Sequence, residues 1–221
     1  MRREFDAVVL AGGRSSRLAG SPKALLRLEG QSLLRRTLEA VRLAHRIAVV
    51  GPAELADEIR HFNDRSGGVP EILLTREEPP FAGPAAGIAA GFRALGAVSG
   101  AVDDGGALPG RADLTLILAC DMPRAAQLPQ QLLSAVAAEE TAELWLPVDS
   151  GGRAQPLASC ADSAALERAL AGFTAAELEG LPVRKLLAGL ATARFELQAG
   201  ATDDVDTWAD ADHFGIPRPA P

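Results

Sequence analysis

Residues 6–23 read DAVVLAGGRSSRLAGSPK, an apolar run followed at once by a glycine-rich segment that carries cations. The run at 6–11 has paired valines at its centre, which is typical of a buried strand. Arg17 and Lys23 supply positive charge to the segment that begins at Gly12. Glycines let a backbone approach a phosphate closely and let its N–H groups point into an anion. The stretch therefore predicts a strand followed by a phosphate-binding loop.

Two common phosphate loops do not fit this segment. A Walker A loop has Lys directly after its last Gly, whereas two residues separate Gly20 from Lys23. The pattern G-x-G-x-x-G is absent because Gly12 and Gly13 are adjacent. An ordinary strand-to-helix connection is the alternative interpretation. The presence of Lys23 favours a functional loop, because the only other lysine of the chain is Lys185.

The rest of the chain alternates buried apolar runs with amphipathic segments. Apolar runs predict further strands at 47–50, 71–75, 114–119 and 144–148. Apolar spacing predicts helices at 31–44, 53–61, 85–95, 128–139, 161–171 and 183–190. Alternating strands and helices favour an α/β fold with a mostly parallel sheet in three layers, α/β/α. We expect one domain over residues 1–221, with a flexible insertion at 98–112, which is rich in Gly, Asp and Ala.

Composition excludes several classes of protein. The chain has 221 residues, 48% of them hydrophobic, and a formal net charge of −7 at pH 7. No run reaches the roughly 18 apolar residues of a membrane span, and the acidic balance argues against a nucleic-acid partner. The N-terminal residues lack the apolar region of an export signal, so we expect a cytoplasmic protein without a membrane partner. Cys120 and Cys160 lie too far apart for a metal motif. The oligomeric state, monomer or homodimer, stays open.

The glycine-rich loop resembles the signature L-A-G-G-x-S-x-R-M-G-x-x-K of the MobA-like nucleotidyltransferases, the family of the molybdenum cofactor guanylyltransferases. The chain departs from the signature at Leu18, which is usually Met, at Ala19, which is often Gly, and at Pro22, which is often Asp and stiffens the approach to Lys23. The resemblance implies a Rossmann-like nucleotidyltransferase fold of the GT-A type. It also implies that Arg17 and Lys23 act in catalysis. The positions implied to bind nucleotide in this loop are Leu10, Ala11, Gly12, Gly13, Ser15, Arg17 and Lys23.

Asp121 directly follows the most strand-like run of the chain. In a parallel sheet, ligands bind at the carboxyl ends of the strands, where this side chain is expected. A carboxylate is costly to bury unless it is paired or bound to metal, and Mg²⁺ prefers carboxylates together with phosphate oxygens. A simple turn before Pro123 is the alternative. The stretch 120–123 resembles the C-D-x-P element of the family, which implies that Asp121 binds the catalytic Mg²⁺.

A second acidic cluster, DDVDTWAD, lies at 203–210. It resembles the D-x-D-T-P-E-D stretch of the family, which makes Asp206 a second candidate metal ligand. The alternative is structural, because Asp206 or Thr207 is suited to cap a short helix. The two interpretations are compatible, since a cap can hold a ligand rigidly.

Three further segments resemble secondary elements of the family. The sequence GPAAG at 83–87 resembles its G-P-L-A-G turn, which implies that Gly83 and Gly87 contact the nucleotide. A helix that begins there presents free N–H groups to a ligand, although close packing on the sheet is the alternative. Glu77 and Glu78 lie near the position of a nucleotide-binding Asp in the family. The sequence QPL at 155–157 resembles an element on the acceptor side.

These residues together predict an Mg²⁺-dependent nucleotidyltransferase. An acceptor phosphate would attack the α-phosphorus of a nucleoside triphosphate and release pyrophosphate, which needs positioning and charge neutralisation rather than a side-chain nucleophile. The resemblance implies GTP and molybdopterin as substrates, and Gly12 favours GTP because cytidylyl-transferring relatives usually read L-A-A-G. The alternatives are CTP with molybdopterin, another acceptor such as 2-phospholactate or a sugar 1-phosphate, and a nucleotide-binding module without turnover.

Overall fold

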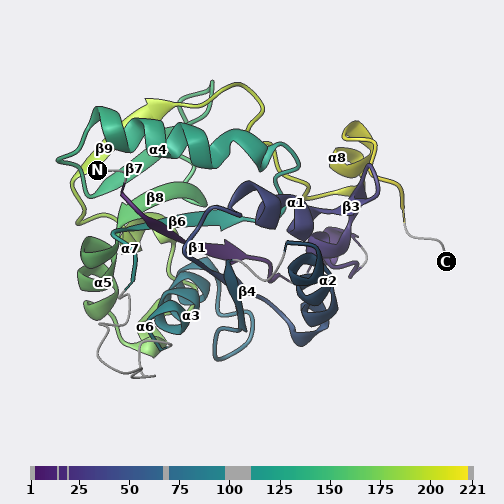
Figure 1. The fold of residues 1–221 in the computed structure, drawn as a ribbon, viewed down its shortest axis with the longest axis horizontal. Helices are drawn as coiled ribbons and strands as arrows, with labels where there is room; N and C mark the ends of the chain where they lie inside the picture. The colour runs from purple at the N-terminus through teal and green to yellow at the C-terminus, as the bar shows by residue number, and fades with distance from the viewer. Residues whose placement is uncertain (1–2, 14, 19, 67–69, 98–110, 219–221) are drawn as a thin grey trace.

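The strand predicted at the head of the chain, β1 (Phe5–Leu10), lies inside a seven-stranded sheet (Figure 1). This computed structural model describes residues 3–13, 15–18, 20–66, 70–97 and 111–218. The other strands are β4 (Arg46–Val50), β5 (Glu71–Thr75), β6 (Leu114–Ala119), β7 (Leu144–Val148), β8 (Ala158–Asp162) and β9 (Thr192–Glu196). Their order in the sheet is β5-β4-β1-β6-β8-β7-β9. Only β8 among them runs antiparallel to its neighbours, so the predicted mostly parallel sheet is confirmed.

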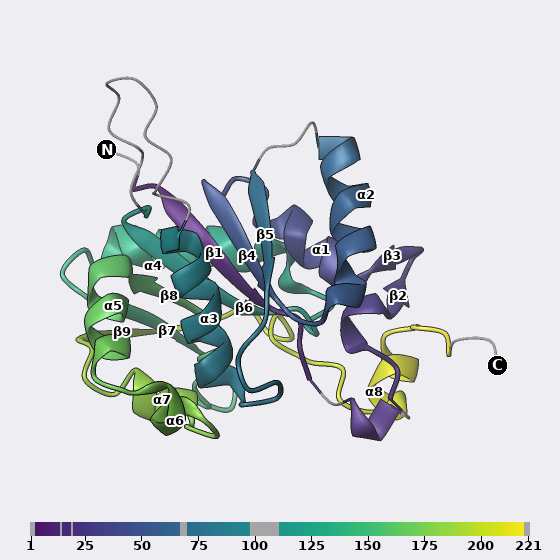
Figure 2. The same cartoon turned by 90° about the horizontal axis from the view of Figure 1, so that it is seen from below.

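Helices cover both faces of the sheet, which gives the three layers predicted (Figures 1 and 2). One face packs against α1 (Leu33–Ala40), α2 (Ala56–Ser66) and α4 (Leu128–Ala138), whose apolar residues share a cluster with Val9, Val49 and Leu116. The opposite face packs against α3 (Pro84–Ala97), α5 (Ser163–Ala171), α6 (Ala175–Leu178) and α7 (Val183–Leu186). The small two-stranded sheet of β2 (Arg27–Leu28) and β3 (Gln31–Ser32) and the helix α8 (Trp208–His213) lie to one side.

A buried carboxylate near the beginning of β1 fixes the position of this strand relative to its neighbours. Asp6 accepts hydrogen bonds from the backbone N–H of Arg46 at 3.0 Å and of Ala112 at 3.1 Å. These bonds join β1 to β4 on one side and to the segment before β6 on the other. The three strands therefore start in register, and their carboxyl ends meet at the same edge of the sheet.

Several predicted element bounds were wrong. The helix predicted at 31–44 is shorter, and the one predicted at 183–190 ends at Leu186. The segment 158–162, whose end was assigned to a helix, forms β8, and β9 was not predicted. Of the insertion predicted at 98–112, residues 98–110 lie outside the described part of the chain. No helix in the described ranges is long and apolar enough to cross a membrane.

Candidate active site

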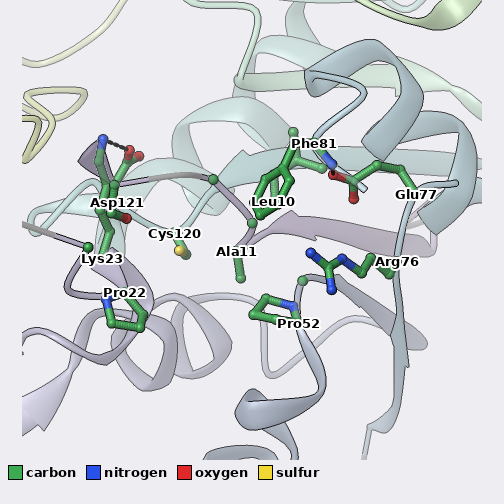
Figure 3. A pocket seen from close by; sticks show the side chains of 15 residues that line it. Leu10, Ala11, Pro22, Lys23, Pro52, Arg76, Glu77, Phe81, Cys120 and Asp121 are labelled. Atoms are coloured by element: carbon green, nitrogen blue, oxygen red, sulfur yellow. Dashed lines mark hydrogen bonds and ion pairs between the residues drawn. The ribbon is translucent and has the colours of Figure 1, made fainter. Parts of the chain in front are cut away.

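A cavity of about 240 Å³ opens at the edge of the sheet where β1, β4 and β6 end (Figure 3). The topological switch of the sheet lies here, because β1 has β4 on one side and β6 on the other. Ligands bind at such points in open α/β sheets. The residues that line the cavity are Leu10, Ala11, Gly12, Gly13, Ser15, Gly20, Pro22, Lys23, Gly51, Pro52, Arg76, Glu77, Phe81, Cys120 and Asp121.

Backbone hydrogen bonds beyond the ends of the strands shape the floor of this cavity. The N–H of Ala11 donates to the carbonyl of Val50 at 2.8 Å, and the N–H of Cys120 donates to the carbonyl of Leu10 at 3.0 Å. An added Cβ at Gly51 would lie 2.6 Å from a methyl group of the buried Leu55 and 3.3 Å from the backbone of Ala11, so glycine lets these segments approach closely. The loops that follow three different strands are thereby held side by side.

The described residues of the glycine-rich loop form tight turns. Ser15 adopts a positive φ of 44°, and its carbonyl accepts hydrogen bonds from the N–H groups of Leu18 and Gly20. Leu18, which stands where the family usually has Met, is fully buried. Pro22 has a φ of −61° in extended conformation and precedes a 3-10 turn that begins at Lys23. The proline therefore fits the loop and sets the direction in which the lysine leaves it.

Lys23 is the centre of an ion-pair network at one end of the cavity. Its Nζ donates to Oδ2 of Asp121 at 3.0 Å and to Oδ1 of Asp206. Arg17 reaches the other oxygen of Asp206 at 3.7 Å, with 73% of its own side chain exposed. The N–H of Val205 donates to the carbonyl of Asp121 at 3.0 Å, which holds the C-terminal acidic segment beside β6.

The charges of this network shift the pKa values of Lys23 and of the neighbouring Asp204. Burial alone would lower the pKa of Lys23, but the charges of Asp121 and Asp206 and their hydrogen bonds outweigh it and raise that pKa above its ordinary value. Partial removal from water, together with the charges of Asp121 and Asp206, raises the pKa of Asp204. Lys23 is therefore an ammonium ion throughout the neutral range.

Among the described residues, three neighbouring carboxylates are grouped closely enough to hold a metal ion. Asp121, Asp204 and Asp206 each offer an oxygen, and these atoms all lie within 4.8 Å of one another. A set made only of carboxylate oxygens suits a hard cation such as Mg²⁺, which also retains water or phosphate oxygens as ligands. The presence of the Lys23 ammonium between Asp121 and Asp206 shows that a cation is accommodated there. The residues present therefore fit a divalent metal.

A short helix fixes Asp206. Thr207 is the N-cap of α8, and the carboxylate of Asp210 accepts hydrogen bonds from the N–H groups of Asp206 and Thr207 at 3.1 and 2.7 Å. This capping box leaves the side chain of Asp206 directed to Lys23. The cap of the helix is therefore Thr207 rather than Asp206, and Asp206 as a metal ligand stays a prediction.

A second cavity of about 290 Å³ adjoins the first and shares with it Leu10, Gly12, Gly13, Glu77, Phe81 and Asp121. Gly83, Gly87 and Leu157 line it as well. Between the two cavities, Oε1 of Glu77 accepts a hydrogen bond from the N–H of Phe81 at 2.9 Å, and the Arg76 guanidinium lies 5.1 Å from the Phe81 ring centre. Figure 3 shows Arg76 and Phe81 across the cavity from Lys23 and Asp121.

The structure brings most of the predicted site residues together. Seven of them line the first cavity, and Gly83 and Gly87 line the second. Asp206 pairs with Lys23, which lines the first cavity, and Arg17 pairs with Asp206. Sequence reasoning missed Arg76 and Phe81. Their only signal was an arginine followed by a carboxylate just after a predicted strand.

Cys120 and Gln155 belong to two of the segments that resemble elements of the family. Cys120 lines the cavity, but burial raises the pKa of its thiol, so it is not a nucleophile. Gln155 donates from Nε2 to Oδ2 of Asp149 at 2.8 Å, within the turn between β7 and β8.

The chain is similar in sequence and in fold to known nucleotidyltransferases. The family model of the MobA-like NTP transferase domain matches residues 7–195. A molybdenum cofactor guanylyltransferase of Shewanella loihica is 28% identical over 158 residues, which cover 71% of this chain and 68% of the relative. The structure of the molybdopterin-guanine dinucleotide biosynthesis protein A of Archaeoglobus fulgidus has a TM-score of 0.63 at 18% identity and covers 95% of this chain and 96% of that one. The inositol-1-phosphate CTP transferase of T. maritima has a TM-score of 0.64 at 14% identity, with coverage of 97% and 94%. Both structures share the fold.

Proposed function

The chain belongs to the MobA-like NTP transferase family and is a nucleotidyltransferase, and from that premise we propose that it transfers guanylate from GTP to the phosphate of molybdopterin. The observation that carries the proposal is the position of Lys23, which lines the cavity beyond β1 and pairs with Asp121 and Asp206. An ammonium group beside a carboxylate pair, next to a glycine-rich loop, is suited to a triphosphate with its metal. Relatives named as molybdenum cofactor guanylyltransferases support this donor and acceptor.

The two adjoining cavities have the polarity that a nucleotide needs. In this proposal the phosphates bind at the end formed by the glycine-rich loop, where the Lys23 side chain lines the cavity. The base lies toward Phe81 and Arg76, because an exposed ring and a guanidinium offer a stacking surface and hydrogen-bond donors. The positive φ of 65° at Phe81 is costly for a bulky residue, and such strain is concentrated at ligand sites.

The absence of a side chain at Gly12 supports a purine base. An added Cβ there would meet Val50 and Gly51 only at ordinary distances of 3.7 and 3.8 Å, so packing within the protein does not require glycine. The space that Gly12 leaves belongs instead to the lining of both cavities. GTP fills that space better than CTP in this proposal.

The reaction is an in-line displacement at the α-phosphorus. A phosphate oxygen of the acceptor forms the new bond to this phosphorus, and the bond to the bridging oxygen of the β-phosphate breaks, so that pyrophosphate leaves with the bonding electrons. An acceptor phosphate needs little deprotonation at neutral pH, so no general base is required. Lys23, Arg17 and the N–H groups of the loop stabilise the charge that develops on the pyrophosphate.

The site also has residues that would hold a divalent cation. Asp121 and Asp206 would bind Mg²⁺ in this proposal, with Asp204 beside them. When bound, the ion supplies positive charge that offsets the charge of the phosphates. Thr207 and Asp210 keep Asp206 in place through the cap of α8.

A screen of nucleotides and acceptors with detection of pyrophosphate tests the proposal. GTP, CTP, ATP and UTP are each combined with molybdopterin, a sugar 1-phosphate and 2-phospholactate in the presence of Mg²⁺. We expect release of pyrophosphate with GTP and molybdopterin. Release only with another pair would replace the proposed substrates. A nucleotide that raises the melting temperature while no acceptor yields pyrophosphate would contradict turnover itself.

A further inference from the structure

The ammonium group of Lys23 stands where the carboxylates best suited to a metal converge. It donates to Asp121 and to Asp206, two of the three residues whose oxygens lie within 4.8 Å of one another. The exposed fraction of the side chain is 21% for Lys23 and 20% for Asp121. A partly buried cation thus offsets part of the negative charge of this acidic cluster.

A divalent cation that approaches the same oxygens therefore meets a competitor. We propose that Lys23 is the resident counter-cation of the Asp121–Asp204–Asp206 cluster and weakens binding of a divalent metal until a triphosphate draws its ammonium away. The inference rests on the proposed function only in naming the triphosphate; the competition between Lys23 and metal is independent of it. The metal then enters productively together with the nucleotide rather than before it.

The side chain of Lys23 has the properties that this exchange needs. A lysine ammonium is a compact point charge on a flexible stem, able to turn from a carboxylate to a phosphate without a fixed fork geometry. Lys23 lines the cavity itself, so its ammonium reaches both the cluster and the space assigned to the phosphates. Pro22 and the following 3-10 turn fix the backbone, so the exchange requires only rotation of the side chain.

Arg17 does not perform the same role. Within the described part of the chain, its guanidinium pairs with Asp206 at 3.7 Å, and it is mostly exposed to solvent, which screens its charge. Loss of Lys23 would therefore leave the three carboxylates with a weak counter-charge. Their mutual repulsion is then relieved best by a divalent cation.

Titration of the protein with Mn²⁺ alone tests the competition, without nucleotide or acceptor. We compare wild type, Lys23→Met, and Lys185→Met, the matched control, since Lys185 is the only other lysine and lies exposed on α7. Removal of one ammonium at hydrogen-bond distance should lower the Kd for Mn²⁺ by roughly tenfold or more. Asp121→Asn combined with Lys23→Met should abolish the gain. Equal Kd values in wild type and Lys23→Met would overturn the proposal.

A second experiment uses the wild-type protein, so that its result does not depend on whether Lys23→Met folds. Because the chain has two lysines, protein labelled with ¹³C at the lysine Cε gives two side-chain signals, which Lys185→Met assigns. Saturating Mg²⁺ should shift the Lys23 signal toward that of a free ammonium and leave the Lys185 signal unchanged. A metal-saturated protein with an unchanged Lys23 signal would overturn the proposal. Since neither experiment contains a nucleotide, failure of the proposed enzyme activity would leave both results interpretable.

Discussion

Lys23 donates a hydrogen bond to Asp121 at 3.0 Å although 98 positions of sequence separate the two residues. Lys23 follows the glycine-rich loop after β1, and Asp121 lies two residues beyond the end of β6, the neighbouring parallel strand. The pairing joins the cation assigned to the phosphates with the carboxylate assigned to the metal.

Gly12→Ala should change the choice of nucleotide without loss of stability. The added methyl group meets no atom of the protein closer than 3.7 Å, so the melting temperature should stay near that of wild type. The methyl group intrudes on the nucleotide cavity, and the KM for GTP should rise by about tenfold relative to that for CTP. Steady-state kinetics with both nucleotides measure the ratio. An unchanged ratio would remove Gly12 from the determinants of base selection.

Arg76→Ala should weaken nucleotide binding while leaving the chemical step intact. Arg76 lines the cavity opposite Lys23 and stacks on Phe81, so its loss removes part of the surface assigned to the base. We expect the KM for GTP to rise by roughly tenfold with kcat little changed. Arg93→Ala, an exposed arginine on α3, is the matched control. A fall in kcat alone would place Arg76 in the reaction rather than in base binding.

Two glycines of α3 should respond differently to substitution by alanine. At Gly91 a Cβ would lie 2.6 and 2.9 Å from methyl groups of Val8 and Val50, buried β-branched residues of the sheet, so Gly91→Ala should cost about 1–2 kcal/mol of unfolding free energy. At Gly87 a Cβ meets one methyl group of Leu10 at 3.1 Å, which can move into the cavity. Gly87→Ala should therefore raise KM more than it lowers stability. Denaturant unfolding measures the stability of both variants, and steady-state kinetics measure their KM values. A larger loss of stability in Gly87→Ala than in Gly91→Ala would contradict the packing described.

The cap of α8 should make stability depend on pH in the acidic range. Hydrogen bonds from the side chain and N–H of Thr207 lower the pKa of Asp210. A carboxyl with a lowered folded pKa contributes stability above its unfolded pKa of about 3.9, and the contribution is lost as pH falls through the folded value. Asp210→Asn should therefore lower the melting temperature at pH 7, and the difference from wild type should shrink below about pH 4. A difference that is constant with pH would show that the charge of Asp210 is not involved.

The parts of the fold that could be predicted are those with a local signal. β1, β4 and β6 are continuous apolar runs, and the loop that follows β1 carries its glycines and cations within a few residues. β8 was missed because its sequence, ASCAD, consists of small residues without apolar periodicity and leads directly into a helix. It is a strand because it fills the space between β6 and β7, which is a property of the whole sheet.

The same division holds for the candidate site. Asp121 could be predicted because it ends a strong strand, and Asp206 because its segment resembles a known element. That Lys23 bridges these two carboxylates could not be predicted, since the contact depends on the hydrogen bond from Val205 to Asp121 and on the cap of α8. Arg76 was missed because a single arginine before two glutamates has no pattern, and only the path of the chain after β5 brings it to the cavity.

The most direct test of the central claim is release of pyrophosphate from GTP and molybdopterin in the presence of Mg²⁺, measured for wild type and Asp121→Asn. Asparagine keeps the shape of the side chain and the backbone contact with Val205, so the variant should fold with a melting temperature near that of wild type. Asp57→Asn, an exposed carboxylate on α2, is the control for removal of a charge. We predict metal-dependent release by wild type and Asp57→Asn, and at least about a 100-fold lower kcat/KM in Asp121→Asn. Full activity in folded Asp121→Asn would contradict the account.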